Sequence, residues 1–230
     1  MAAAGRVTAK TRIYQLKIQL RGVRPPVWRR VLFPGEMNLA ELHEVVQTAM
    51  GWTNSHLHEF EVEGARYGLP DPDWGLDEVV DESRVKLFRV AQEGTRLRYA
   101  YDFGDGWVHD VTVEKVLSWQ LGTRYPCCIA GRRACPPEDV GGPWGYQDFL
   151  VAVSDPGHAE HEQWVEWVGG RFDPAEFDLA AVDKSLDAFA WPQSPVRRCG
   201  DRHRGQRSRR WQIRAQAKVA SAVTVLAVLS

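Results

Sequence analysis

The sequence is poor in cysteine and has no long apolar segment. Its 230 residues include only 4 cysteines, too few to suggest a disulfide framework in a chain of this size. The longest apolar stretch, residues 219–229, is roughly half of the ~20 residues that a membrane-spanning helix needs. The first residues, Met-Ala-Ala-Ala-Gly-Arg, lack the apolar core of a signal peptide. We therefore expect a cytoplasmic protein that makes no membrane contact.

Motifs of known chemistry are missing as well. The sequence has no HExxH motif and no CxxC pair, so two familiar zinc-binding patterns are absent. The glycine-rich segment 141–145 lacks the Lys-Ser/Thr that completes a P-loop. Cys127 and Cys128 are adjacent, which suits buried apolar side chains better than two ligands of one metal ion. The chain therefore carries no recognisable catalytic code.

Charges of opposite sign are unevenly distributed along the chain. The formal net charge is −1, from 29 lysines and arginines against 30 acids. Residues 196–230 hold nine basic residues and a single acid, Asp201, so the remainder of the chain is acidic. This asymmetry is typical of a tail that contacts nucleic acid or folds back on an acidic body. We expect residues 191–230 to form a basic, disordered tail.

Strand patterns dominate the first half of the sequence. Apolar residues alternate with polar ones over 13–20, and Pro25-Pro26 marks a bend before a second strand. The clearest hairpin has Gly104-Asp105-Gly106 as its turn, because glycine permits a positive φ. The predicted strands are 13–20, 27–33, 57–62, 85–90, 96–103 and 107–116.

Helix patterns dominate the second half. One helix comes early: Asn38 and Glu41 have the spacing of a capping box, and the apolar face that follows ends at Gly51. Three later helices are predicted over residues 146–153, 158–168 and 173–189. The fold class is therefore α+β, a mainly antiparallel β-sheet with one early helix and a helical C-terminal half.

Ordered motifs give the chain a family resemblance. It resembles the plasmid pRiA4b ORF-3-like family, which implies a compact α+β domain over residues 12–190, after an N-terminal extension over residues 1–11. The family is sometimes found on plasmids and has no established activity, so the resemblance implies a link to mobile elements and no particular chemistry. The matching segments are Tyr14–Ile18, Pro25–Arg30, Leu42–His43, Met50–Trp52, His56–Phe60, Tyr101–Asp105, Trp107, His109, Pro136–Gly142 and Gly145–Tyr146.

Three histidines are candidate metal ligands. His56 and His58 share the apolar face of their predicted strand, and His109 shares the apolar face of a later one. If these strands are neighbours, the imidazoles converge near Asp102 or Asp105 and form a first shell for Zn, Mn or Fe. The alternative is that each histidine bonds a carbonyl or an acid at the edge of the core. We favour this second interpretation and predict no cofactor unless the cluster holds a divalent metal.

Acids, aromatics and arginines form a candidate binding surface. The acids beside the glycine turns could bind a cation or serve in acid–base chemistry, or simply accept turn amides. Trp28 with Arg29 and Arg30 could stack a base and hold a phosphate, or lie on an edge strand that pairs with the acidic body. The candidate residues are Trp28, Arg29, Arg30, Asp102, Asp105, Trp107, Glu138, Asp139, Trp144 and Tyr146.

These patterns support two functional hypotheses. The first is a non-catalytic module that binds protein or nucleic acid through its aromatic and glycine-rich loops. The second is a metal-dependent hydrolase of phosphoesters, with the three histidines as ligands and Asp102 or Glu138 as a further ligand or base. The absence of a nucleophile or cofactor motif favours the first hypothesis, although the partner stays unknown.

Overall fold

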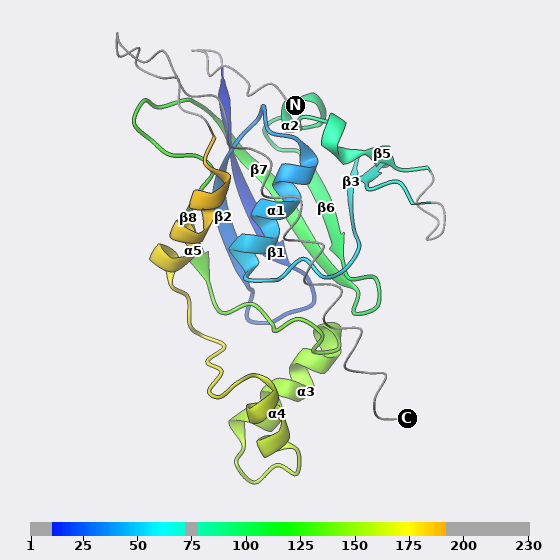
Figure 1. Cartoon of the computed structure of the whole chain (residues 1–230), viewed down its shortest axis with the longest axis vertical. Helices are drawn as coiled ribbons and strands as arrows, with labels where there is room; N and C mark the ends of the chain where they lie inside the picture. The colour runs from blue at the N-terminus through cyan, green and yellow to red at the C-terminus, as the bar shows by residue number, and fades with distance from the viewer. Residues whose placement is uncertain (1–10, 72–77, 192–230) are drawn as a thin grey trace, which may run out of the picture. The chain divides into compact units, whose positions relative to one another are not determined.

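The computed structural model describes residues 11–71 and 78–191 (Figure 1). The chain divides into two compact units, Met1–Ser194 and Pro195–Ser230, and all described residues belong to the first. The predicted N-terminal extension and basic tail lie outside the described residues, apart from Thr11 and Trp191.

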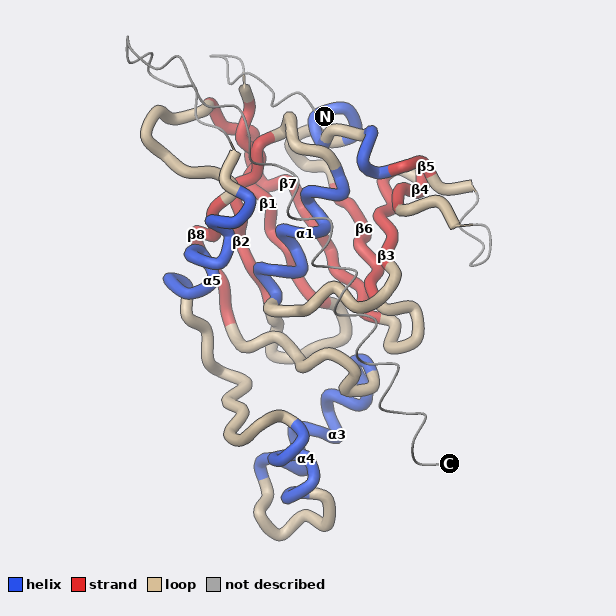
Figure 2. Tube along the Cα trace, viewed as in Figure 1, coloured by secondary structure: helices blue, strands red, loops and turns tan. Residues whose placement is uncertain are grey.

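An eight-stranded sheet is the framework of the fold (Figure 2). Its strand order is β5-β4-β3-β6-β7-β1-β2-β8, and every neighbouring pair is antiparallel except β4 and β5. The predicted α+β class with a mainly antiparallel sheet is confirmed. The strands are β1 (Arg12–Leu20), β2 (Trp28–Pro34), β3 (His58–Val62), β4 (Ala65–Gly68), β5 (Val80–Asp81), β6 (Arg96–Tyr101), β7 (Trp107–Ser118) and β8 (Cys127–Arg132).

The two predicted hairpins provide the central strands. β1 pairs with β2 as one hairpin and with β7, the second strand of the other. Leu16, Ile18 and Leu20 of β1 are buried, whereas Lys17 and Gln19 between them are half-exposed. Because side chains alternate along a strand, this pattern gives the sheet one apolar and one polar face.

Helix α1 (Leu39–Met50) covers the apolar face (Figure 1). Its start is the predicted capping box: the Asn38 side chain accepts a hydrogen bond from the Glu41 amide, and the Glu41 carboxylate accepts one from the Asn38 amide. Gly51 ends the helix in the left-handed region, at φ 89°. The apolar residues predicted on one face, including Leu42 and Val46, are fully buried.

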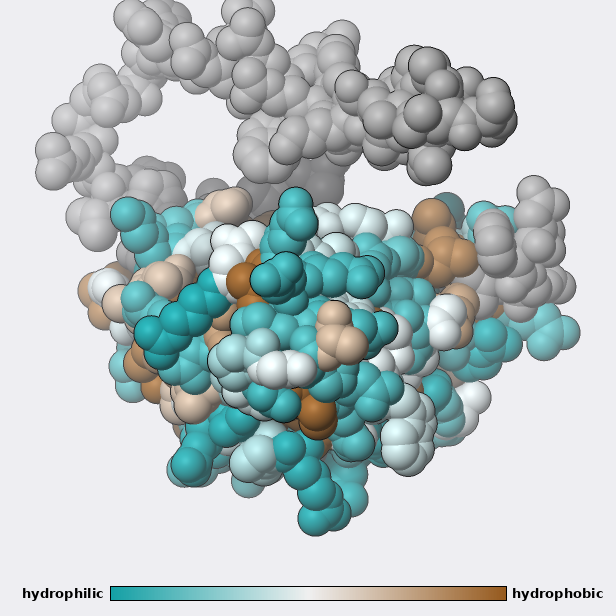
Figure 3. Space-filling model, turned by 90° about the horizontal axis from the view of Figure 1, so that it is seen from below, coloured by the Kyte–Doolittle hydropathy of each residue, from teal (hydrophilic) through white to brown (hydrophobic). Residues whose placement is uncertain are grey.

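Three further α-helices follow the last strand. α3 (Gly142–Ser154) and α4 (His161–Trp167) pack through aromatic side chains, with Phe149 edge-on to Trp164 at 5.4 Å between ring centroids. α5 (Leu179–Ser185) and the short η3 (Leu186–Phe189) lie against β8, where Asp183 accepts a hydrogen bond of 2.9 Å from the Cys128 amide. Seen from below, the surface is mostly hydrophilic with scattered apolar residues (Figure 3).

Two of the predicted elements differ from the structure. Residues 85–90 were predicted as a strand, but they contain the short helix α2 (Leu87–Val90). The 3-10 helix η2 (Glu82–Arg84) comes directly before them. Strand pairing is limited there to one antiparallel bridge between Lys86 and Asn38, after which the chain turns into α2. The last helix begins after Asp178, because Asp173 only caps a turn through the Ala175 amide.

The helical region is also shorter than predicted. Strands continue to Arg132, so the helices fill the described residues after position 141 and not the whole C-terminal half. Within the described residues, no helix combines the length and the apolar character that crossing a bilayer demands.

The capping box gives a first prediction. Asn38→Ala removes a side-chain acceptor from the first turn of α1, so we expect the free energy of unfolding to fall by about 1 kcal/mol. Urea denaturation followed by circular dichroism measures the change. Gln147→Ala, an exposed change within α3, serves as the control, and an equal effect of both variants would contradict a capping role.

Candidate functional site

Three loops from distant parts of the sequence meet where β6 ends and β7 begins. We call them loop A (residues 52–57), turn B (residues 102–106) and loop C (residues 136–142), and together the loop site. The Asp102 amide donates to the Leu57 carbonyl at 2.9 Å, which joins turn B to loop A. The Trp52 indole donates to the Pro136 carbonyl at 2.8 Å, which joins loop A to loop C.

Glu138 ties loop C to its neighbours. Its carboxylate accepts hydrogen bonds from the Thr53 amide at 2.7 Å and from the Tyr101 hydroxyl at 2.5 Å. Burial raises the pKa of Tyr101, and the hydrogen bond to Glu138 raises it further, so the phenol stays protonated and donates. Glu138 is therefore a positioning residue that holds the next residue, Asp139, in place.

Turn B and loop C approach each other at a glycine. Gly142 has φ 69°, and a Cβ there would collide with the carbonyl oxygen of Asp105. The Gly141 amide also donates to the Asp105 carboxylate at 3.1 Å. The two glycine-punctuated segments of the sequence are thus in direct contact, and Asp105 has a structural partner.

The loop site brings one histidine and two aspartates together. The Nε2 atom of His56 lies 2.8 Å from Oδ1 of Asp139 and 3.6 Å from Oδ2 of Asp102. All three ligand atoms lie within 4.8 Å of one another. The side chains are 30%, 66% and 11% exposed for His56, Asp139 and Asp102, so solvent can reach the group.

Asp102 has one committed oxygen and one free oxygen. Its Oδ1 accepts hydrogen bonds from the amides of Gly104 and Asp105 at 3.0 and 3.2 Å. Within residues 11–71 and 78–191, its Oδ2 makes no hydrogen bond and lies toward His56. The residue as a whole is 8% exposed. A buried carboxylate with an uncommitted oxygen is suited to a cation, because burying charge without a partner is costly.

A hollow of about 360 Å³ adjoins this group. His56 and Asp102 line it with Ser55, Leu57 and Phe103. The nitrogen and carboxylate donors are those of Zn²⁺, Mn²⁺ or Fe²⁺ sites. The residues therefore fit a divalent ion with room beside it for a ligand.

The other two candidate histidines lie elsewhere. β6 separates β3, which carries His58, from β7, which carries His109, and the side chain of Tyr99 lies between them, 5.9 and 5.4 Å from their rings. The predicted faces are right, since both histidines point to the apolar side. The assumption that their strands are neighbours is wrong, so the three histidines do not share one ion.

His58 is instead stacked on a histidine that sequence reasoning missed. Its ring lies 3.4 Å from that of His43, nearly parallel at 5°, and its Nε2 bonds the buried Glu82 at 2.9 Å. His43 receives a hydrogen bond from Tyr99 at 2.7 Å and donates to Asn54 at 2.8 Å. Burial, followed by the charge of His58, lowers the pKa of His43 to about 3, so its ring is neutral.

His109 lies inside the core. It is fully buried, and neither ring nitrogen finds a hydrogen-bond partner in the described part of the chain. Burial lowers its pKa to about 3. The favoured interpretation, a histidine at the edge of the core bonded to a carbonyl or an acid, is therefore wrong for His109 within the described residues.

The candidate binding surface divides into buried and exposed residues. Arg29 is 3% exposed and donates to the carbonyls of Ala49 and Arg132, so it is a structural cation. Trp107 and Tyr146 are core residues, whereas Trp144 is 79% exposed. The candidates that remain accessible are Trp28, Arg30, Asp105, Glu138, Asp139 and Trp144, with Asp102 at the edge of the loop site.

The cysteines agree with their apolar interpretation. Cys127 and Cys128 are buried, and burial raises the pKa of the Cys127 thiol to about 11. Burial also raises the pKa of Cys135 to about 12. These thiols are protonated at neutral pH and poorly suited to nucleophilic attack.

The fold gives the class of the protein, and comparison with known proteins gives its family. The fold and site define an α+β domain with an antiparallel sheet and a site built from three loops at one end of its central strands. The chain belongs to the plasmid pRiA4b ORF-3-like protein family, which it matches over residues 12–181. The family membership predicted from the motifs is thus confirmed.

Two relatives support this assignment. The chain is 44% identical over 181 residues to the uncharacterised protein y4hQ of Sinorhizobium fredii (strain NBRC 101917 / NGR234), a match that covers 77% of this chain and 92% of that protein. It is similar to the crystal structure of a protein of unknown function, MM3350 from Methanosarcina mazei Go1. That match has a TM-score of 0.69 and 38% identity, and covers 74% of this chain and 97% of the other.

The buried histidines predict acid sensitivity. Their pKa values of about 3 lie below the ordinary 6.5, so the unfolded chain binds protons first as the pH falls. Below about pH 6, each histidine therefore lowers the free energy of unfolding by about 1.4 kcal/mol per pH unit. We expect His109→Phe to make this dependence shallower by about that amount between pH 5.5 and 4.5.

Urea denaturation across this pH range measures the difference between the variant and the wild type. His158→Phe, a change outside the core, is the control and leaves the slope unchanged. Parallel curves for wild type and His109→Phe would show that His109 is protonated equally in both states, against the expectation.

Proposed function

We propose that this chain is a non-catalytic binding module whose loop site holds a divalent metal ion. His56, Asp102 and Asp139 are the protein ligands, and the ion binds an anionic group of a partner, a carboxylate or a phosphate. The observation that supports this proposal is the convergence of the three ligand atoms within 4.8 Å. They come from three separate loops, which hydrogen bonds join to one another.

The charge and number of the ligands suit this role. Two carboxylates balance the charge of a divalent ion, and one imidazole adds a nitrogen donor typical of Zn²⁺ and Mn²⁺ sites. Three protein ligands leave coordination positions for an outside group. The Nε2 atom of His56 is hydrogen-bonded to the Asp139 carboxylate. A metal ion that binds both groups must displace the proton between them.

The neighbouring polar groups favour binding over catalysis. Glu138 is engaged by Thr53 and Tyr101, and Glu82 is engaged by His58. His43 is held between Tyr99 and Asn54. Groups fixed in this way keep a site rigid, whereas a general base needs access to a substrate proton.

A metal-dependent hydrolase of phosphoesters is the second candidate. The hollow beside His56 and Asp102 favours it, because a bound ion could activate water next to a substrate there. Both candidates require the ion, so metal binding is tested first and turnover second.

Metal titration tests the site directly. We expect the full chain, freed of metal by a chelator, to bind about one equivalent of Zn²⁺ or Mn²⁺ in calorimetry. His56→Ala and Asp102→Asn each remove a ligand and raise the Kd at least about tenfold. His158→Ala is the matched histidine control and binds like wild type. Failure of the wild type to take up either ion, or equal affinity in all variants, would refute the site.

Turnover separates the two candidates. Metal-loaded wild type and Asp102→Asn are each incubated with bis(p-nitrophenyl) phosphate, and release of nitrophenol is followed by absorbance. A binding module gives the same background rate for both proteins. A metal-dependent rate that Asp102→Asn abolishes would replace the binding module with the hydrolase.

A further inference from the structure

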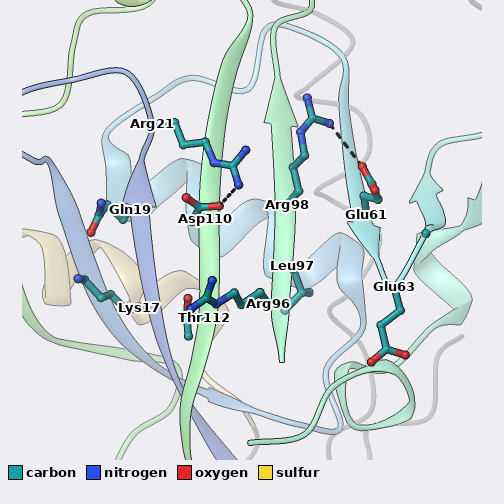
Figure 4. Close-up of a pocket in the computed structure, with 11 residues that line it drawn as sticks. Lys17, Gln19, Arg21, Glu61, Glu63, Arg96, Leu97, Arg98, Asp110 and Thr112 are labelled. Carbon is teal, nitrogen blue, oxygen red and sulfur yellow. Dashed lines mark hydrogen bonds and ion pairs between the residues drawn. The ribbon is translucent and has the colours of Figure 1, made fainter. Parts of the chain in front are cut away.

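The polar face of the sheet carries a second candidate surface, away from the loop site. We call it the open face, and it consists of half-exposed or exposed residues on four neighbouring strands. Part of it lines a hollow of about 580 Å³, drawn in Figure 4. Its residues are Lys17 and Gln19 of β1, Trp28 and Arg30 of β2, Arg96 and Arg98 of β6, and Asp110, Thr112 and Glu114 of β7.

Most acids of this surface are already paired. Arg21 pairs with Asp110, Arg30 pairs with Glu114 at 2.6 Å, and Arg98 lies 3.8 Å from Glu61. In the described part of the chain, neither Lys17 nor Arg96 forms an ion pair. Lys17 and Arg96 therefore have only longer-range attraction from Glu114 and Asp110, acids that already pair with Arg30 and Arg21.

These cations form a row across the sheet. Arg30, Lys17, Thr112 and Arg96 occupy directly paired positions on β2, β1, β7 and β6. At the usual spacing of neighbouring strands, the row is roughly 14 Å long. In Figure 4 the side chain of Arg96 extends toward Thr112, on the side where Lys17 stands. The row is long enough for more than one phosphate of a nucleic-acid strand.

The row is unfavourable for the sheet alone. Lys17 and Arg30 are directly opposite each other, and like charges in that position destabilise a strand pair. Glu114 offsets the cost for Arg30, because its two carboxylate oxygens accept hydrogen bonds from the Arg30 guanidinium at 2.6 and 2.8 Å. Lys17 keeps no such ion pair within the described residues, and departures from local rules of sheet stability are typical of functional surfaces.

An aromatic ring stands at one end of the row. Trp28 is half-exposed, and the ammonium of Lys17 and the guanidinium of Arg30 lie 5.7 and 5.1 Å from its ring. Aromatic rings next to cations bind single-stranded nucleic acid, because a base stacks on the ring while phosphates contact the cations. An acidic peptide would use the cations, but only a nucleic acid would also supply a base to the exposed part of the ring.

We infer that the open face binds single-stranded nucleic acid, with phosphates along Arg30, Lys17 and Arg96 and a base stacked on Trp28. The surface shares no residue with the metal ligands, so the inference is independent of the proposed metal site. It also needs nothing from residues 196–230, whose basic composition would otherwise be the obvious source of nucleic-acid affinity.

Fluorescence anisotropy of the full chain with a labelled oligothymidylate of about 12 nucleotides tests the inference. We expect the double variant K17Q/R96Q to weaken binding at least about tenfold, and Trp28→Ala about fivefold or more. Each lost phosphate contact lowers the salt dependence of log K by about 0.7, so the double variant loses about 1.4. Arg84→Gln, an exposed arginine outside the open face, is the control and binds like wild type.

Further outcomes separate the inference from its alternatives. A double variant that binds like wild type would place the affinity elsewhere and overturn the inference. Tighter binding of polyglutamate than of the oligonucleotide would assign the face to an acidic protein partner, and would also overturn it. Thr112→Glu adds an acid to the middle of the row and must weaken binding too. Thermal unfolding of each variant confirms that it is folded before its affinity is compared.

Discussion

The close approach of Gly142 to the carbonyl of Asp105 is the contact on which the loop site depends. Only a residue without a Cβ fits there, so loop C can lie against turn B. Glu138 then reaches Thr53 and Tyr101, and the Asp139 carboxylate lies beside His56. The ligand atoms thus converge through backbone packing and through hydrogen bonds to the Glu138 carboxylate.

The core beneath the sheet contains polar groups next to this site. His43 sits between Tyr99 and Asn54, and the Asn54 amide nitrogen donates to Glu44, which fixes the amide orientation that lets Asn54 accept from His43. His109 has no such network in the described part of the chain. Both rings are neutral because burial disfavours their charge. In the folded protein, neither His43 nor His109 therefore takes up an additional proton near neutral pH.

Local patterns predicted local structure well, and long-range order set the limit. The capping box at Asn38 and the hairpin turn at Gly104–Gly106 depend on neighbouring residues, so the sequence was enough to find them. The faces of His58 and His109 follow from alternation alone. Their separation depends on β6 lying between their strands, which no local pattern encodes. His43 was missed although it falls within the buried stripe of α1, where a polar residue signals an internal partner.

Long-range order also explains why the sequence reveals the loop site and the open face to different extents. Asp102 and Asp139 are 37 positions apart, and only the glycine contacts of two loops bring them together, so the motifs marked the residues without their joint role. Arg30, Lys17 and Arg96 come from three strands. Arg30 was a candidate through its place beside Trp28, whereas Lys17 and Arg96 each look like an ordinary exposed cation in their own strand. Pairing register alone turns them into a row. A row of charges that runs across the strands cannot be recognised in the sequence. It becomes evidence for a ligand only when the pairing of the strands is known.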